Sequence, residues 1–197
     1  MSQGDALSRQ AASFSEEALS ALMPLLANCK AEINSATLSR IESELKGNAQ
    51  LSALIERAGS DRRLAAHIRR IVREKFGQFF DESALLAHAI NKPYGYPGDC
   101  WMLEALYDAR PVSLTEAGRV IDLWCMQTAL PLAVVERKEI IKKILQQVMA
   151  EKKGLKILSI ACGGAREIRE ISADVLAGHQ ITLLDNDPRV YEFFCEK

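Results

Sequence analysis

The sequence lacks the features that mark several large classes of protein. Its 197 residues carry 25 lysines and arginines against 26 aspartates and glutamates, for a net charge of −1. No global attraction to nucleic acid or to an anionic membrane is therefore expected. The apolar runs fall far short of a membrane span. The first ten residues lack a charged segment followed by an apolar one, so no secretory signal is expected.

Cysteine and histidine are sparse and unpatterned. The five cysteines are odd in number, widely spaced and without a C-x-x-C pair. This pattern favours reduced thiols and a cytoplasmic location. The three histidines show no paired spacing, so no metal site is expected.

Apolar residues at helical spacing predict a helical segment over residues 1–150. Gly59 and Ser60 are expected to end one helix and Asp61 to cap the next. Helices are expected over residues 5–28, from 35 to 58 with an interruption at 47–48, from 62 to about 76, from 81 to before Pro93, over 100–107, over 114–129 and, after a break at Pro131, over 132–150.

The third of these helices is rich in basic residues: Arg62, Arg63, Arg69, Arg70, Arg73 and Lys75. A contact with nucleic acid or with an acyl carrier is one interpretation. We favour a solvated basic face, because no interleaved aromatic residues or glycine loops accompany the charges.

Residues 155–188 carry the most informative pattern of the sequence. They predict a strand, a glycine turn, a helix and a second strand that ends on an acidic residue. Two short apolar runs are expected to be strands buried on both faces of a parallel sheet. A turn of small residues, 162–165, separates the first strand from a helix over about 165–176. The apolar residues of these elements are Ile157, Leu158, Ile160 and Ala161 in the first strand, Ile168, Ile171 and Val175 in the helix, and Ile181, Leu183 and Leu184 in the second strand. The order predicts the first half of a nucleotide-binding βαβ unit in an α/β fold.

Each part of this unit has a chemical reason. Gly163 and Gly164 lack a Cβ, which lets backbone approach a ligand and allows positive φ. Asp185 lies about 20 residues past the turn, where a carboxylate reaches ribose hydroxyls. No G-x-G-x-x-G fingerprint or P-loop lysine motif is present, so the phosphate-binding versions of this unit are not matched.

The turn resembles the first motif of class I S-adenosylmethionine-dependent methyltransferases, which reads roughly D-x-G-x-G-x-G. Here Ala161 and Ala165 replace the outer glycines, and Ser159 stands at the usual acid position. Alanine costs little at those two positions if φ is negative there.

A second stretch, NKPYGYPGD over residues 91–99, narrows the resemblance. With the ILSIACGGARE segment it is similar to bacterial methyltransferases assigned to the biosynthesis of 3-hydroxypalmitic acid methyl ester, a quorum-sensing signal. The resemblance implies that Tyr94, Tyr96 and Asp99 line the cofactor or substrate cavity. The alternative is an ordinary loop in which Asp99 caps the following helix, and capping is expected in both cases.

The resemblance also implies a cofactor, S-adenosyl-L-methionine, and the residues that bind it. Its methionine and ribose parts would lie against Ala161, Cys162, Gly163 and Gly164. Asp185 would hold the ribose hydroxyls, and Asn186 would lie by the adenine edge. The implied acceptor is a 3-hydroxy fatty acid carboxylate. No catalytic residue is identified: His88 is conceivable as a base, but a half-buried packing histidine is favoured.

These expectations give two domains, a helical N-terminal cap over residues 1–150 and a partial Rossmann-like core over 151–197. A class I core has seven strands and this sequence supplies two, so we expect a piece of a longer enzyme that is inactive alone. Two rivals stay open. One is an NAD-dependent Rossmann oxidoreductase, and the other is a non-catalytic helical interaction module.

Overall fold

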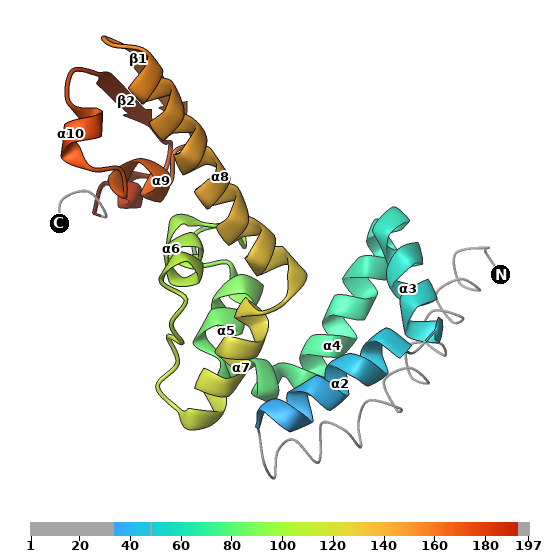
Figure 1. Ribbon diagram of the computed structural model, residues 1–197. Coiled ribbons are helices and arrows are strands. Elements are labelled where there is room, and N and C mark those ends of the chain that lie inside the picture. Colours follow the sequence, from blue (N-terminus) through green and yellow to red (C-terminus); the bar gives the residue numbers. More distant parts are fainter. Residues whose placement is uncertain (1–33, 48, 193–197) are drawn as a thin grey trace. The chain divides into compact units, whose positions relative to one another are not determined.

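A computed structural model describes residues 34–47 and 49–192 of the chain (Figure 1). The chain forms two compact units, the first from residues 1–84 and 113–124, the second from residues 85–112 and 125–197. The helix expected over residues 5–28 lies outside the described residues. The domain boundary at residue 150 stays a prediction, and the second unit draws on residues from both sides of it.

The first unit is helical. It contains α2 (Ser35–Gly47), α3 (Ala49–Ser60), α4 (Arg62–Glu82) and most of α7 (Glu116–Met126). α3 packs against both α2 and α4. The predicted cap at Asp61 is confirmed, because its carboxylate accepts hydrogen bonds from the backbone N–H groups of Arg63 at 2.8 Å and Leu64 at 3.1 Å.

A buried aspartate ties the start of α7 to the end of α4. The Asp122 carboxylate, which is fully buried, accepts from the Ser83 hydroxyl at 2.6 Å and from the backbone N–H of Ser113 at 2.8 Å. Gly118 lies at the same junction, where a Cβ would stand 2.2 Å from the backbone oxygen of Glu82. Close backbone packing therefore requires glycine at this position.

The second unit contains the sheet and the helices that pack beside it. Its helices are α5 (Ala84–Asn91), α6 (Cys100–Asp108) and α8 (Ala129–Glu151), followed by β1 (Lys156–Ile160), α9 (Arg166–Arg169), α10 (Ala173–Leu176), β2 (Gln180–Leu184) and the 3-10 turn η1 (Pro188–Tyr191). β1 and β2 are parallel, in a register that runs from Lys156 opposite Gln180 to Ile160 opposite Leu184. α8 packs against α6, α9 and α10 (Figure 1). The described chain is thus mixed helical with a small two-stranded parallel sheet, which is compatible with an α/β fold.

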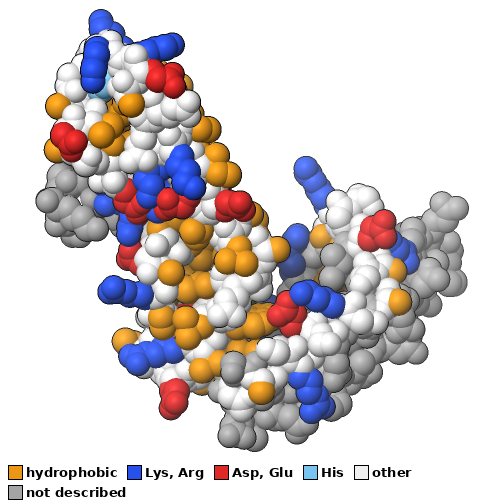
Figure 2. All heavy atoms as spheres, viewed as in Figure 1, with side chains coloured by type: hydrophobic (Ala, Val, Ile, Leu, Met, Phe, Trp, Pro, Cys, Tyr) orange, Lys and Arg blue, Asp and Glu red, His pale blue; other side chains and the backbone are white. Residues whose placement is uncertain are grey.

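The strands are not buried on both faces, so this expectation was wrong. Burial alternates along each strand, and Leu158, Ile160 and Leu184 are 58%, 68% and 55% exposed. Two strands covered by helices on one face leave the other face to solvent. Apolar side chains also emerge along α8 (Figure 2), where Ile140 and Ile144 are exposed.

Two helix predictions also need correction. The single helix expected after the glycine turn is two short helices, α9 and α10, with Ser172 in an extended conformation between them. The break expected at Pro131 does not occur, because α8 begins at Ala129 and holds Pro131 in its first turn. Proline is tolerated there, since the N–H groups of the first turn have no partner within the helix.

Candidate functional site

The candidate site lies where the two parallel strands end side by side. β1 leads into residues 161–165 and β2 leads into Asp185. The backbone N–H of Cys162 donates to the oxygen of Leu184 at 3.2 Å, which continues the pairing past the end of β1. Crevices at the carboxyl ends of parallel strands are where α/β folds bind ligands.

The Asp185 carboxylate is aimed at the glycine turn. Its Oδ2 accepts from the backbone N–H of Gly163 at 2.8 Å, and its Oδ1 accepts from the backbone N–H of Asp187 at 3.0 Å. Asp185 is half-buried. An ionised carboxylate has about four lone-pair positions, so the two bonds fix its orientation and leave acceptor capacity for a ligand.

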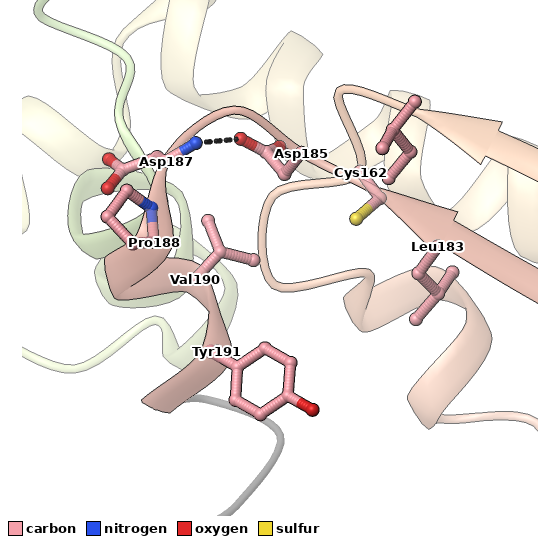
Figure 3. A pocket seen from close by; sticks show the side chains of 8 residues that line it. Cys162, Leu183, Asp185, Asp187, Pro188, Val190 and Tyr191 are labelled. Carbon is pink, nitrogen blue, oxygen red and sulfur yellow. Dashed lines mark hydrogen bonds between the residues drawn. The ribbon is translucent and has the colours of Figure 1, made fainter.

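A cavity of roughly 530 Å³ opens beside this carboxylate, within the usual size range of small-molecule pockets. Figure 3 shows Cys162, Leu183 and Val190 facing the same space, with the Tyr191 ring at its rim. The lining residues are Cys162, Leu183, Leu184, Asp185, Asp187, Pro188, Val190 and Tyr191. The wall is largely apolar with carboxylates at one end, a pattern suited to an organic ligand that carries hydrogen-bond donors.

Cys162 is not poised as a nucleophile. Burial and then the negative charge of Asp185 raise the pKa of its thiol above the ordinary value. Because the thiolate is the reactive form, this shift disfavours a nucleophilic role for Cys162, whose side chain forms part of the cavity wall.

The turn itself is left-handed at three alternate residues. φ is +55° at Ala161, +50° at Gly163 and +44° at Ala165. The two alanines therefore do not have the negative φ under which alanine costs little. A left-handed alanine costs about 1 kcal/mol or more, so this turn holds strain that glycine would relieve.

The two glycines of the turn have different structural reasons. At Gly163 an added Cβ would meet only Leu103 Cδ1, at 3.9 Å, so its backbone faces open space. At Gly164 the added Cβ would stand 2.3 Å from Glu104 Oε1. The missing side chain at Gly164 is therefore explained by close packing against α6, whereas Gly163 keeps the open approach that a ligand needs.

Glu104 contacts the glycine turn, and no motif in the sequence marks it as a site residue. Its carboxylate accepts from Arg166 Nη1 at 2.8 Å and from Arg169 Nη2 at 2.5 Å. Arg169 Nε also donates to the Gly164 carbonyl at 2.6 Å. The two arginines that follow the turn thus clamp it to α6. They were visible in the sequence, but their partner lies more than sixty residues earlier in the chain.

A second group of charged side chains holds the end of α9 against α8. Glu170 accepts from Lys138 at 2.8 Å, from Lys142 at 2.7 Å and from Arg166 at 2.9 Å. Figure 2 shows acidic and basic side chains gathered where α8 passes α9. Burial alone would raise the pKa of Glu170, but the hydrogen bonds from these three cations outweigh burial and lower the pKa to about 2.

Asp99 is not among the residues that line this cavity. It is fully buried, and its Oδ1 caps α6 by accepting from the backbone N–H of Met102 at 2.9 Å, as the capping interpretation predicts. Its Oδ2 lies 2.6 Å from His88 Nε2. The His88 ring stacks on Trp101 with centroids 4.2 Å apart and is 12% exposed. His88 is therefore a packed, paired residue that anchors the loop of residues 92–99.

Neither tyrosine of this loop is among the residues that line the cavity, but Tyr94 contacts the turn that follows β2. Tyr94 lies against the guanidinium of Arg189, which stands 3.6 Å from its ring centroid. Tyr96 is 46% exposed. Burial and then the negative charge of Asp185 raise the pKa of its phenol above the ordinary value.

The remaining predicted residues lie at the solvent side of the site. Ala161 and Asn186 are exposed, and neither lines the cavity.

Within residues 34–47 and 49–192, no group of histidine, cysteine or carboxylate side chains is arranged to hold a metal ion. None of the helices in that part of the chain has the length and apolar character that spanning a bilayer requires.

The chain was compared with protein-family models, with curated proteins and with solved structures. No family model matches it, and neither a curated protein nor a solved structure is significantly similar to it.

Proposed function

We propose that the second unit, over residues 85–112 and 125–192, binds the nucleoside part of S-adenosyl-L-methionine and that the chain belongs to a methyltransferase of the class I type. The observation that carries the proposal is the Gly163–Asp185 hydrogen bond of 2.8 Å beside a cavity of roughly 530 Å³. In this proposal β1, the glycine turn, α9, α10 and β2 correspond to the first βαβ unit of a Rossmann-like core.

The residues at the strand ends suit a nucleoside without phosphate. Asp185 is fixed by two backbone donors and keeps lone pairs for ribose hydroxyls. A pyrophosphate is disfavoured, because the helix after the turn is only four residues long and a phosphate site draws on the N–H groups of a longer helix. Asn186, being exposed, is free to meet an adenine edge.

The cofactor would supply a methyl group on a sulfonium, which an acceptor displaces in line. The protein's task is then to position the two reactants and to keep water away. The apolar wall formed by Leu183 and Val190 suits the second task. If the acceptor is the carboxylate of a 3-hydroxy fatty acid, as the family resemblance implies, it is already a nucleophile and needs no strong base.

Calorimetry on the full chain tests the cofactor. We expect S-adenosylhomocysteine to bind and Asp185→Asn to weaken binding by roughly tenfold or more, the value of a hydrogen bond to a charged group. Asp174→Asn is the control, because Asp174 is an exposed carboxylate on α10. Binding of NADH without S-adenosylhomocysteine would instead support the oxidoreductase rival.

The acceptor needs a separate assay. With labelled S-adenosylmethionine, methyl transfer to a 3-hydroxy fatty acid is the expected result. Transfer only to amines or to nucleic acid would remove the fatty-acid part of the proposal and leave the cofactor part standing.

A further inference from the structure

Arg189 joins two segments of the second unit that are far apart in sequence. Its guanidinium lies over the Tyr94 ring, 3.6 Å from the centroid, a cation–π arrangement. The same guanidinium donates two hydrogen bonds to the Asp187 carboxylate, from Nε and Nη2, each 2.7 Å long. The Asp187 side chain is 5% exposed, whereas that of Arg189 is 38% exposed, so the two hydrogen bonds orient the guanidinium on a buried carboxylate while the arginine stays open to solvent.

The contacts continue from Asp187 into the cavity through the backbone. Asp187 caps η1 by accepting from the backbone N–H of Arg189 at 3.1 Å, and its own N–H donates to Asp185 Oδ1 at 3.0 Å. Figure 3 shows this last bond, with the Asp187 carboxylate directed away from Cys162. Asp187 therefore acts on the cavity by holding the turn that aims Asp185 at Gly163.

On its other side, Tyr94 contacts the anchored base of its loop. Its ring meets His88 edge-on with centroids 5.4 Å apart. His88 is in turn paired with Asp99 and stacked on Trp101. The tip of the loop has one described backbone hydrogen bond, from Gly95 N–H to the Lys92 oxygen at 2.8 Å. Tyr94 thus connects the well-packed start of the loop, at His88, to the turn that carries Arg189 beside the cavity.

We propose that Arg189 is a positioning residue that couples the loop of residues 92–99 to the Asp185 carboxylate. It clamps Tyr94 on one side and Asp187 on the other, so the orientation of Asp185 and the order of the loop depend on each other. A ligand that binds Asp185 therefore reduces the motion of the loop. The ligand half of this inference rests on the proposed nucleoside pocket, whereas the coupling of loop and turn does not.

The test uses the full chain in two measurements. Hydrogen exchange reports the order of residues 92–99, and calorimetry reports binding of S-adenosylhomocysteine. We expect Arg189→Met to speed exchange in the loop and to weaken binding roughly tenfold, the scale of a partly desolvated cation–π contact together with its ion pair. Tyr94→Leu should do the same, whereas Tyr94→Phe keeps the ring and should behave as the unmodified chain.

The double variant separates coupling from two unrelated losses. Because Arg189→Met already removes the contact with Tyr94, adding Tyr94→Leu to it should weaken binding no further than Arg189→Met does alone. Arg189→Lys, which keeps the charge but not the paired hydrogen bonds, should restore part of the binding. Arg110→Met is the matched control, because Arg110 is an exposed arginine of the same unit.

Each failure has a distinct meaning. Unchanged loop exchange in Arg189→Met overturns the coupling, whether or not a ligand binds. The coupling is also overturned if the double variant loses binding by the product of the two factors measured for Arg189→Met and Tyr94→Leu. If the unmodified chain does not bind S-adenosylhomocysteine, the proposed function fails, and the exchange measurement still decides whether Arg189 holds the loop.

Discussion

Replacement of Gly164 by alanine tests whether the glycine turn is held by α6. The new Cβ would lie 2.3 Å from Glu104 Oε1, 3.1 Å from Glu104 Cδ and 3.2 Å from Arg169 Nη2. The φ of Gly164 is not in the left-handed region, so the backbone itself accepts alanine. The main obstacle is the Glu104 carboxylate, which must leave its place between Arg166 and Arg169, and the Arg169 guanidinium must shift by a few tenths of an ångström.

The cost follows from the contacts that Glu104 would lose. Its side chain is 13% exposed, and those of its two arginine partners are 16% and 17% exposed. Hydrogen bonds between charged groups contribute about 1.5–3 kcal/mol each when buried. Both arginines keep other acceptors, namely Asp108 and Glu170 for Arg166 and the Gly164 carbonyl for Arg169. We therefore expect Gly164→Ala to lower the free energy of unfolding by about 2 kcal/mol.

A double-mutant cycle makes the prediction specific. Glu104→Ala alone removes the same two ion pairs and is expected to cost about 2 kcal/mol. With Glu104 truncated, the alanine at position 164 meets no carboxylate, so the double variant should lose little more than either single variant. The expected coupling between the two changes is then about 1.5–2 kcal/mol.

Urea unfolding followed by tryptophan fluorescence measures these differences. The chain has two tryptophans, Trp101 in the second unit and Trp124 in the first, so a Trp124→Phe background makes the signal report the second unit alone. Gly98→Ala is the control, because its added Cβ meets nothing within 4 Å. Additive losses in the double variant, or no loss in Gly164→Ala, would refute the clamp by Glu104.

Three further measurements follow from the structure. The pKa of Glu170 is lowered from 4.5 to about 2, so its contribution to stability is complete above pH 4.5 and is lost as pH falls toward 2. We expect the free energy of unfolding to fall by about 1–2 kcal/mol over this range, after allowing for solvent screening. Glu170→Gln should not show this pH-dependent loss. Gly118→Ala brings a Cβ within 2.2 Å of a backbone oxygen and should cost about 3 kcal/mol or more by thermal unfolding, whereas Gly59→Ala, with open space, should not destabilise. Ala161→Gly, at φ +55°, should stabilise by about 0.5 kcal/mol, while Ala177→Gly, at φ −59°, should destabilise by a similar amount.

Local patterns predicted the local structure well. Most of the described helices fall where apolar spacing placed them, the exceptions being the divided helix after the glycine turn and the start of α8, and the caps at Asp61 and Asp99 form as expected. The parallel pairing of β1 and β2 also follows from the strand–turn–strand order. These features depend on residues close in sequence, which is why a single sequence was enough to find them.

Long-range packing was not predictable in the same way. Glu104 carries no motif, and only the folded chain brings it to Arg166 and Arg169. The sequence analysis explained Gly164 by the approach of a ligand and did not predict its contact with Glu104. A glycine that a neighbouring side chain requires cannot be told from sequence apart from one that a ligand requires. The strand residues Leu158 and Ile160 are apolar yet exposed, since burial depends on what covers the sheet and not on the strand alone.

The same contacts show which part of the chain shapes the candidate site. Glu104 on α6 sets the position of the turn that follows β1, and Tyr94 before α6 contacts the turn that follows β2. Both residues belong to the compact unit that contains the sheet. If that grouping governs folding, the loss of the Glu104 and Tyr94 contacts should disturb the strand ends while leaving the first unit intact. The geometry at Asp185 is therefore a property of α6, its preceding loop and the two strands together, and the glycine turn alone does not determine it.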